Sequence, residues 1–234
     1  MSHRYRIMAV GRQSGAEYSC GLWRNILARY TEARCRMCRR EGLKLFLKGD
    51  RCFSDRCALE RRGYAPGQHG QMRVKVSDYG IRLMEKQRLR HSYGVQEAQF
   101  RRYFDLADRQ KGVTGNNLLV ILERRLDNVV YRLGFAESRS QARQLVRHGF
   151  FSVNNRRVNI PSFLVSLGDV IDVVNKENVI TPIKQSQEAI ARRGVPEWLE
   201  LNQEKLQGRV KSFAERGHIT LPIHEQLIVE FYSK

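Results

Sequence analysis

The chain has 234 residues, enough for one large domain or two modest ones, and 41% of them are hydrophobic, which suffices for a buried core. Lysine and arginine number 42 against 24 aspartate and glutamate, a formal net charge of +18. This excess favours a polyanionic partner, nucleic acid before an anionic membrane surface. The sequence has no apolar run long enough for a transmembrane helix, and its first residues do not follow a secretory pattern.

The positive charge is concentrated in residues 28–160, where arginine outnumbers lysine, whereas residues 161–234 hold nine basic and ten acidic side chains. The planar guanidinium group matches the geometry of phosphate oxygens. We therefore expect the polyanion-binding face to come from residues 28–160. Residues 1–27 are expected to form an extension outside the folded domains. Three explanations of this extension are open: a disordered tail, a start assigned too far upstream, or an organelle transit peptide.

Four cysteines lie within 23 residues, at Cys35, Cys38, Cys52 and Cys57. Two short-range pairs separated by about a dozen residues are typical of a tetrahedral four-thiolate site. Four protein ligands leave no open position, so the predicted metal is structural: one zinc ion, with an iron–sulfur cluster as the alternative. Free thiols or two disulfides are the non-metal alternatives. Cys20 lies outside the pattern and is expected to be an ordinary thiol.

Glycines and a proline interrupt the basic segment 61–76, which predicts a loop. Its His69 is a weaker candidate for a metal ligand. Helical spacing of apolar residues then predicts a helix over 77–93 and a second one over about 96–110. A continuous apolar stripe predicts one long helix from about 117 to 133.

A short basic helix is predicted over 139–148, with Ser138 as its N-cap and Gln141 completing a capping box. It carries no acid, and three arginines follow at four-residue intervals, which places them on one face. A solvated helix face normally interleaves acidic residues among the basic ones. This pattern therefore predicts contact with nucleic-acid phosphates. The arginines are Arg139, Arg143 and Arg147.

Beyond this helix the hydrophobic period changes from that of a helix to two, the period of strands. Asn154 and Asn155 predict a tight turn, because asparagine tolerates positive φ. A strand is predicted over 170–174, and the final segment 225–232 is expected to be a short strand or the end of a helix.

These residues resemble a known family. The stretch from Arg125 to Phe135, the arginine helix, Ala65 to Gly70 and the ending Glu225 to Ser233 closely resemble small-subunit ribosomal protein S4. The cysteine segment resembles the bacterial, four-cysteine, zinc-containing type. The resemblance implies an α+β fold: an N-terminal helical domain with a four-cysteine metal knuckle, plus an S4 RNA-binding module of two helices packed on a small twisted antiparallel sheet.

Four regions are expected on this basis. They are an extension at 1–27; the N-terminal helical domain at 28–122, with the knuckle at 33–60 and the basic loop at 61–76; the RNA-binding module at 123–185; and a C-terminal segment at 186–234 that packs back on the N-terminal domain.

The resemblance also implies a function. The protein would be a structural constituent of the small ribosomal subunit that binds its rRNA directly and nucleates assembly of the subunit body. Its neighbours would include the S5-family protein, with which it would contribute to translational accuracy, and mRNA at the entry channel. A cytoplasmic ribosome is expected before an organellar one, with no membrane and no small-molecule substrate. The candidate RNA-binding residues are Arg36, Arg39, Arg40, Arg61, Arg62, Gln68, His69, Arg73, Lys75, Lys86, Arg88, Arg124, Arg125, Arg139, Ser140, Arg143, Arg147, His148, Asn155, Arg156 and Arg157.

Three other functions are less consistent with the sequence. Some pseudouridine synthases carry an S4-type module and an Arg-Leu-Asp motif, which Arg125-Leu126-Asp127 matches superficially. Here Asn128 follows inside an amphipathic stretch, in place of the Thr-Ser-Gly element of those enzymes, so no enzyme is predicted. A free-standing regulatory RNA binder would need the same basic surface, and the length of the family resemblance favours the ribosomal function. A membrane-surface protein is disfavoured, because no exposed apolar face accompanies the basic one.

Overall fold

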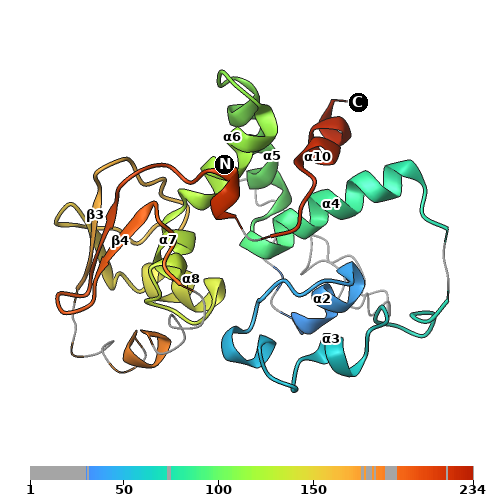
Figure 1. Cartoon of the computed structure of the whole chain (residues 1–234), viewed down its shortest axis with the longest axis horizontal. Helices are drawn as coiled ribbons and strands as arrows, with labels where there is room; N and C mark the ends of the chain where they lie inside the picture. The colour runs from blue at the N-terminus through green and yellow to red at the C-terminus, as the bar shows by residue number, and fades with distance from the viewer. Residues whose placement is uncertain are drawn as a thin grey trace, which may run out of the picture.

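A computed structural model describes residues 30, 32–72, 75–174, 177, 181, 183–187, 194–219 and 221–233. The predicted extension at 1–27 and the candidate Arg73 lie outside these residues. Figure 1 shows two parts side by side, one built of helices and one that combines helices with a sheet. Within the described ranges the helices are too short or too polar to cross a bilayer.

The helical part begins with the cysteine segment and continues into three longer helices. Its elements are α2 (Cys35–Glu41), η1 (Gly49–Cys52), α3 (Ala58–Arg61), α4 (Asp78–Tyr93), α5 (Glu97–Asp108) and α6 (Thr114–Glu123). The helices predicted from residues 77 and 96 are confirmed. Ser77 caps α4 by accepting a hydrogen bond from the Gly80 amide, and Gly94 ends it in the left-handed conformation.

The single helix predicted from 117 to 133 is wrong, because the chain breaks between α6 and α7 (Leu126–Arg132). Arg125 is extended and forms an isolated β-bridge with Leu164. The Leu126 amide donates to the Phe163 carbonyl at 2.8 Å, and the Asp127 amide donates to the Pro161 carbonyl at 3.1 Å. These distant carbonyls satisfy amides that a continuous helix would have satisfied internally, so tertiary contacts override the apolar stripe.

The arginine helix is confirmed as α8 (Arg139–Arg147). The Ser138 hydroxyl accepts a hydrogen bond from the Gln141 amide at 3.3 Å, as the N-cap prediction required. The reciprocal half of the capping box is shifted by one residue, because the Gln141 side chain accepts from the Glu137 amide at 2.8 Å.

Five strands form one antiparallel sheet in the order β2-β1-β3-β5-β4. They are β1 (Phe151–Val153), β2 (Arg156–Arg157), β3 (Val170–Val173), β4 (Leu199–Asn202) and β5 (Gln207–Val210). The β1–β2 turn is the one predicted: φ is 49° at Asn154 and 64° at Asn155. The α+β fold with helices on an antiparallel sheet is thereby confirmed.

The C-terminal residues divide between the two parts of the molecule. Strand β5 pairs with β3, so residues 199–210 complete the sheet of the module. Further along, α10 (Glu225–Tyr232) packs on α4 and α6 of the helical part. Ile219, Leu221 and Ile223, which precede α10, also belong to the core of the helical part, so the return expected for 186–234 begins near residue 219. The final segment is a helix.

Each part has its own apolar core. One core lies among α7, α8 and the sheet and includes Phe135, Phe151 and Trp198. The other lies among α4, α5, α6 and α10 and includes Leu89 and Phe100. Helix α8 and the C-terminal end of α4 meet where the two parts adjoin, and the candidate site is located there.

Candidate nucleic-acid interface

The three arginines of α8 differ in exposure and in hydrogen-bond partners, although they are evenly spaced along the helix. Arg147 is exposed. Arg143 is half-buried and donates to the Asp127 carboxylate at 3.4 Å. Arg139 donates to the Asn128 side-chain oxygen at 2.8 Å. The outer end of this face therefore offers an exposed charge, whereas its inner end is fixed by contacts within the protein.

Arg139 also joins the two parts of the molecule. Its guanidinium carbon lies 4.8 Å from the ring centroid of Tyr93 on α4 and 4.7 Å from that of Tyr131 on α7. Cation–π contacts of this kind contribute about 0.5–2 kcal/mol, more when the cation is shielded from water. They hold the N-terminal end of α8 against the C-terminal end of α4.

A buried network supports this junction from below. Glu123 accepts hydrogen bonds from Tyr93 at 2.5 Å, from Asn128 at 2.6 Å and from Arg132 at 2.8 and 3.1 Å. Burial by itself raises the pKa of Glu123, but the adjacent Arg132 charge and its hydrogen bonds outweigh burial, so the pKa is lowered overall. Burial raises the pKa of Tyr93, with a further contribution from the Glu123 charge. The network therefore holds a carboxylate and a neutral phenol, and fixes the ring on which Arg139 stacks.

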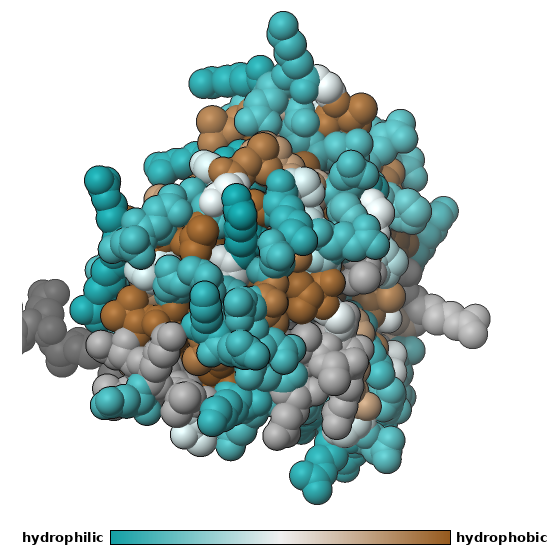
Figure 2. All heavy atoms as spheres, turned by 60° about the vertical axis from the view of Figure 1, so that its left-hand side comes forward, coloured by the Kyte–Doolittle hydropathy of each residue, from teal (hydrophilic) through white to brown (hydrophobic). Residues whose placement is uncertain are grey.

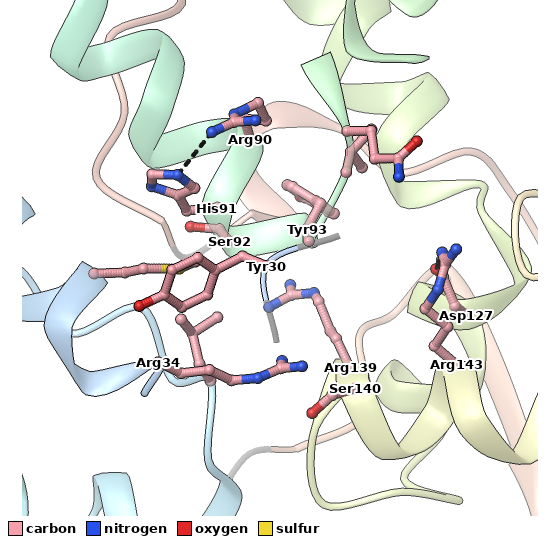
Figure 3. Close-up of a pocket in the computed structure, with 15 residues that line it drawn as sticks. Tyr30, Arg34, Arg90, His91, Ser92, Tyr93, Asp127, Arg139, Ser140 and Arg143 are labelled. Carbon is pink, nitrogen blue, oxygen red and sulfur yellow. Dashed lines mark hydrogen bonds and ion pairs between the residues drawn. The ribbon is translucent and has the colours of Figure 1, made fainter. Parts of the chain in front are cut away.

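A pocket lies at this junction, and Figure 3 shows its side chains. Four arginines line it, from the N-cap of α2, from α4 and from α8, and among the lining residues the single acid is Asp127. In the close-up the Arg34 and Arg139 side chains extend from opposite sides into the same space. Burial lowers the pKa of Arg34, and within the described ranges no carboxylate pairs with it. The arginines are Arg34, Arg90, Arg139 and Arg143.

The β1–β2 hairpin extends the basic surface from the C-terminal end of α8. Arg157 donates to the Gly149 carbonyl at 2.7 Å and to the His148 carbonyl at 3.2 Å, so it ties the hairpin to the helix. Asn155 and Arg156 are exposed at the turn. Figure 2 shows that hydrophilic side chains cover most of the visible face on this side, with small apolar areas between them.

The N-terminal segment supplies a second set of exposed charges. Arg39 donates to the carbonyls of Tyr64 and Ala65 at 3.0 and 3.3 Å, and its guanidinium stacks over the Tyr64 ring at 5.0 Å. It therefore attaches α2 to the start of the basic loop. The exposed candidates on these two elements are Arg36, Arg40, Arg61, Arg62, Gln68, His69 and Lys75.

Two of the candidate RNA contacts are buried. Arg125 is 0% exposed; it donates to both Asp127 oxygens at 3.0 and 2.6 Å and to the Tyr103 hydroxyl at 2.7 Å. Lys86 is 5% exposed and pairs with Glu97 at 2.6 Å. These environments do not suit a phosphate contact, so Arg125 and Lys86 hold the fold together and do not reach the RNA-facing surface.

Two further candidates are half-buried and hold the fold together. Arg124 donates to the Val165 carbonyl at 2.9 Å and stacks over the Phe213 ring at 4.7 Å. Arg88 pairs with Glu85 and donates to the Glu41 carbonyl at 3.3 Å. Both therefore have protein partners that an RNA contact would have to share.

Sequence reasoning missed Arg34 and Arg90, which the structure brings to the pocket beside α8. The clustering of arginines at 34–40 and at 88–90 was visible in the sequence. Their approach to α8 was not, because it depends on how α2 and α4 pack against the module.

No disulfide joins the four cysteines of the predicted metal site in the described part of the chain. Burial raises the pKa of the Cys38 thiol to about 11; the nearby Cys35, Cys52 and Cys57 add to the rise, and the Leu45 amide opposes it. As they stand, the described residues contain no group of three or more Cys, His, Asp or Glu arranged to hold a metal ion.

Comparison with known proteins finds two family models that match this chain. The model of the ribosomal protein S4/S9 N-terminal domain matches residues 29–123, and the model of the S4 domain matches residues 124–171. The boundary between the two matches coincides with the break between α6 and α7. The basic helix, the antiparallel sheet and these matches together define a protein of the ribosomal class.

The relatives narrow this class further. A protein of Syntrophus aciditrophicus is 62% identical over 209 residues, and one of Desulfovibrio desulfuricans is 64% identical over 208 residues. Each alignment covers 89% of this chain and all of the relative, and both relatives are called small ribosomal subunit protein uS4. A 61% identical relative from Geobacter has the same name and coverage. The chain belongs to the ribosomal protein S4 family, uS4.

Proposed function

We propose that this protein is a structural constituent of the small ribosomal subunit that binds small-subunit rRNA directly and catalyses no reaction. The observation that carries the proposal is the convergence of basic side chains from α2, α4 and α8 around one junction, continued by the β1–β2 hairpin. The shared name of the relatives supports the same function.

The basic surface combines two kinds of arginine, exposed ones and one that is fixed by contacts within the protein. Exposed arginines such as Arg147 and Arg156 can follow phosphate positions, and they supply the salt-dependent part of the affinity through counterion release. Arg139 is already held by Asn128 and two tyrosine rings, so little conformational freedom remains to be lost when RNA binds. Fixed and adaptable contacts together suit a folded RNA, which is recognised mainly by shape and backbone.

The test is binding of the full chain to a small-subunit rRNA transcript at several salt concentrations. If about 6–10 phosphates are contacted, affinity falls by roughly 10³–10⁵-fold between 50 and 200 mM salt. Arg147→Glu is expected to weaken binding, whereas Lys111→Glu, a charge reversal at an exposed position in the loop between α5 and α6, is the matched control. Equal affinity for rRNA and for a neutral polymer, or a flat salt response, would refute the proposal.

We also propose the finer assignments that the family resemblance implies. The protein nucleates assembly of the subunit body, neighbours the S5-family protein at an interface that affects accuracy, and lies beside mRNA at the entry channel of a cytoplasmic ribosome. Direct rRNA binding through two separate parts of the chain supports an early place in assembly, because one protein can then fix two RNA segments relative to each other. Cross-linking within assembled subunits tests the S5-family and mRNA contacts.

For the cysteine segment we propose one structural zinc ion held by Cys35, Cys38, Cys52 and Cys57. The chemistry of the donor set suits zinc, because three of the four thiols are buried and the Lys48 amide donates to the Cys52 sulfur at 3.4 Å. That hydrogen bond partly offsets the rise that burial causes in the pKa of Cys52. When bound, zinc would tie the loop after η1 to α2. Elemental analysis of protein purified under reducing conditions distinguishes zinc from an iron–sulfur cluster, and absence of both metals would contradict the site.

A further inference from the structure

The pocket between α2, α4 and α8 has a composition that a phosphate site does not explain. Its arginines are accompanied by the apolar side chains of Met37, Leu47 and Val95 and by the ring of Tyr30. A phosphate gains nothing from apolar walls, whereas unpaired RNA bases are bound by stacking on aromatic rings and guanidinium planes. The pocket thus combines stacking surfaces with hydrogen-bond donors.

Its dimensions also suit a planar ring. The cavity measures about 140 Å³. An apolar protein cavity of about 150 Å³ is known to accept benzene, so one six-membered ring fits here while a second ring would remain at the mouth. In Figure 3 the Tyr30 ring, the Arg34 side chain and the Arg139 side chain border the same open space, with Ser140 beside them.

The polar groups around this space favour a particular base edge. Guanidinium groups only donate hydrogen bonds, and four of them line the pocket. Asp127, the acidic residue among them, already accepts from Arg125 and Arg143. A base edge that offers carbonyl oxygens therefore matches the lining better than one that offers amino groups, which favours uracil or guanine over adenine.

We propose that this pocket receives one unpaired nucleobase of the bound rRNA, with a carbonyl edge toward the arginines and its ring against Tyr30 and the apolar floor. The inference rests on the proposed function, since it concerns the same RNA. It assigns base recognition to a junction where the sequence predicted only backbone contacts. It also gives Arg34 a partner, because its half-buried guanidinium would stack on or donate to the base.

The experiment fills the pocket without changing charge. Ser140→Phe places a ring in the space that the base would occupy, and Ser212→Phe at an exposed position away from the pocket is the matched control. Ser140→Phe is expected to weaken rRNA binding by about 10–100-fold, the effect of losing one stacked base, with an unchanged salt slope because no phosphate contact is lost. Circular dichroism and thermal melting verify that both variants fold.

A second readout observes the base itself. A carbodiimide reagent modifies unpaired uracil and guanine, so wild-type protein should protect one such nucleotide that is reactive in free RNA. Ser140→Phe should remove this protection and leave the others. Tyr30→Ala should act like Ser140→Phe, and Tyr30→Phe, which keeps the ring and loses only the hydroxyl bond to the Ala33 carbonyl, should restore binding.

The two proposals fail in different ways. If wild-type protein binds rRNA with the expected salt dependence but Ser140→Phe binds equally well, or still protects every base, the nucleobase pocket is refuted and the proposed function stands. A shallower salt slope in Ser140→Phe would mean that a phosphate contact was lost, which also overturns the nucleobase assignment. If wild-type protein does not bind rRNA, both proposals fall.

Discussion

Replacement of Arg125 tests whether this residue stabilises the fold, as its burial indicates, or contacts RNA, as the sequence predicted. The side chain is completely buried and forms a two-pronged ion pair with Asp127. In Arg125→Ala the Asp127 carboxylate keeps only the longer, 3.4 Å contact with Arg143. Breaking a buried pair by removing one partner costs about 3–5 kcal/mol, because the remaining charge is left without compensation. For a chain of this size, that cost lowers the melting temperature by roughly 6–20 °C.

The assay pairs thermal unfolding with rRNA binding measured well below the melting temperature. Arg125→Ala should lose stability and keep the wild-type salt slope of binding, since a buried guanidinium releases no counterions. Exposed Arg156→Ala, the control, should keep its stability and lower the salt slope by about 1. The double change Arg125→Met with Asp127→Leu should recover part of the stability. A stable Arg125→Ala variant with a reduced salt slope would show that Arg125 contacts phosphate after all.

Three further predictions concern packing, pH and metal. Gly208→Ala should destabilise the folded chain by about 1–3 kcal/mol, because an added Cβ would lie 2.3 Å from a Leu133 methyl group. Gly217→Ala, which has open space around it, should unfold like the wild type, and equal urea midpoints for the two variants would contradict the packing around Gly208. The pKa of Glu123 is lowered in the folded state, so the ionised carboxylate stabilises the fold above the unfolded pKa of about 4.3, and this stabilisation is lost as the pH falls below that value. Glu123→Gln should therefore flatten the acid side of the curve of unfolding free energy against pH. An unchanged acid side would count against the Glu123 network. Chelation should increase hydrogen exchange within 33–60 and leave 124–174 protected, and uniform exchange with and without chelator would argue against a structural metal.

Much of the fold follows from local signals in the sequence. Ser77 and Gly94 bound α4, Ser138 begins α8, and the two asparagines make the β1–β2 turn, because capping and positive φ depend on neighbours a few residues away. The break at Arg125 was not predictable in this way. The carbonyls that receive the α7 amides belong to Pro161 and Phe163, nearly forty residues further along the chain.

In the candidate interface, too, some features follow from the local sequence and others depend on distant residues. The spacing of arginines on α8 correctly predicted a basic helix face, but spacing cannot tell an exposed guanidinium such as Arg147 from one fixed between rings such as Arg139. Burial of Arg125 depends on Tyr103 and Asp127 meeting around it. Arg34 reaches the α8 pocket only because the helical part packs against the module. These features are tertiary and have no local signature.

Sedimentation tests the central claim most directly. The full chain, carrying an epitope tag, is expressed in its own cells, and the lysate is separated on a sucrose gradient at magnesium concentrations that keep ribosomes either whole or dissociated. We expect the protein in the small-subunit peak after dissociation, and in the whole-ribosome peak at high magnesium. Recovery at the top of the gradient, or with the large subunit, would contradict the account.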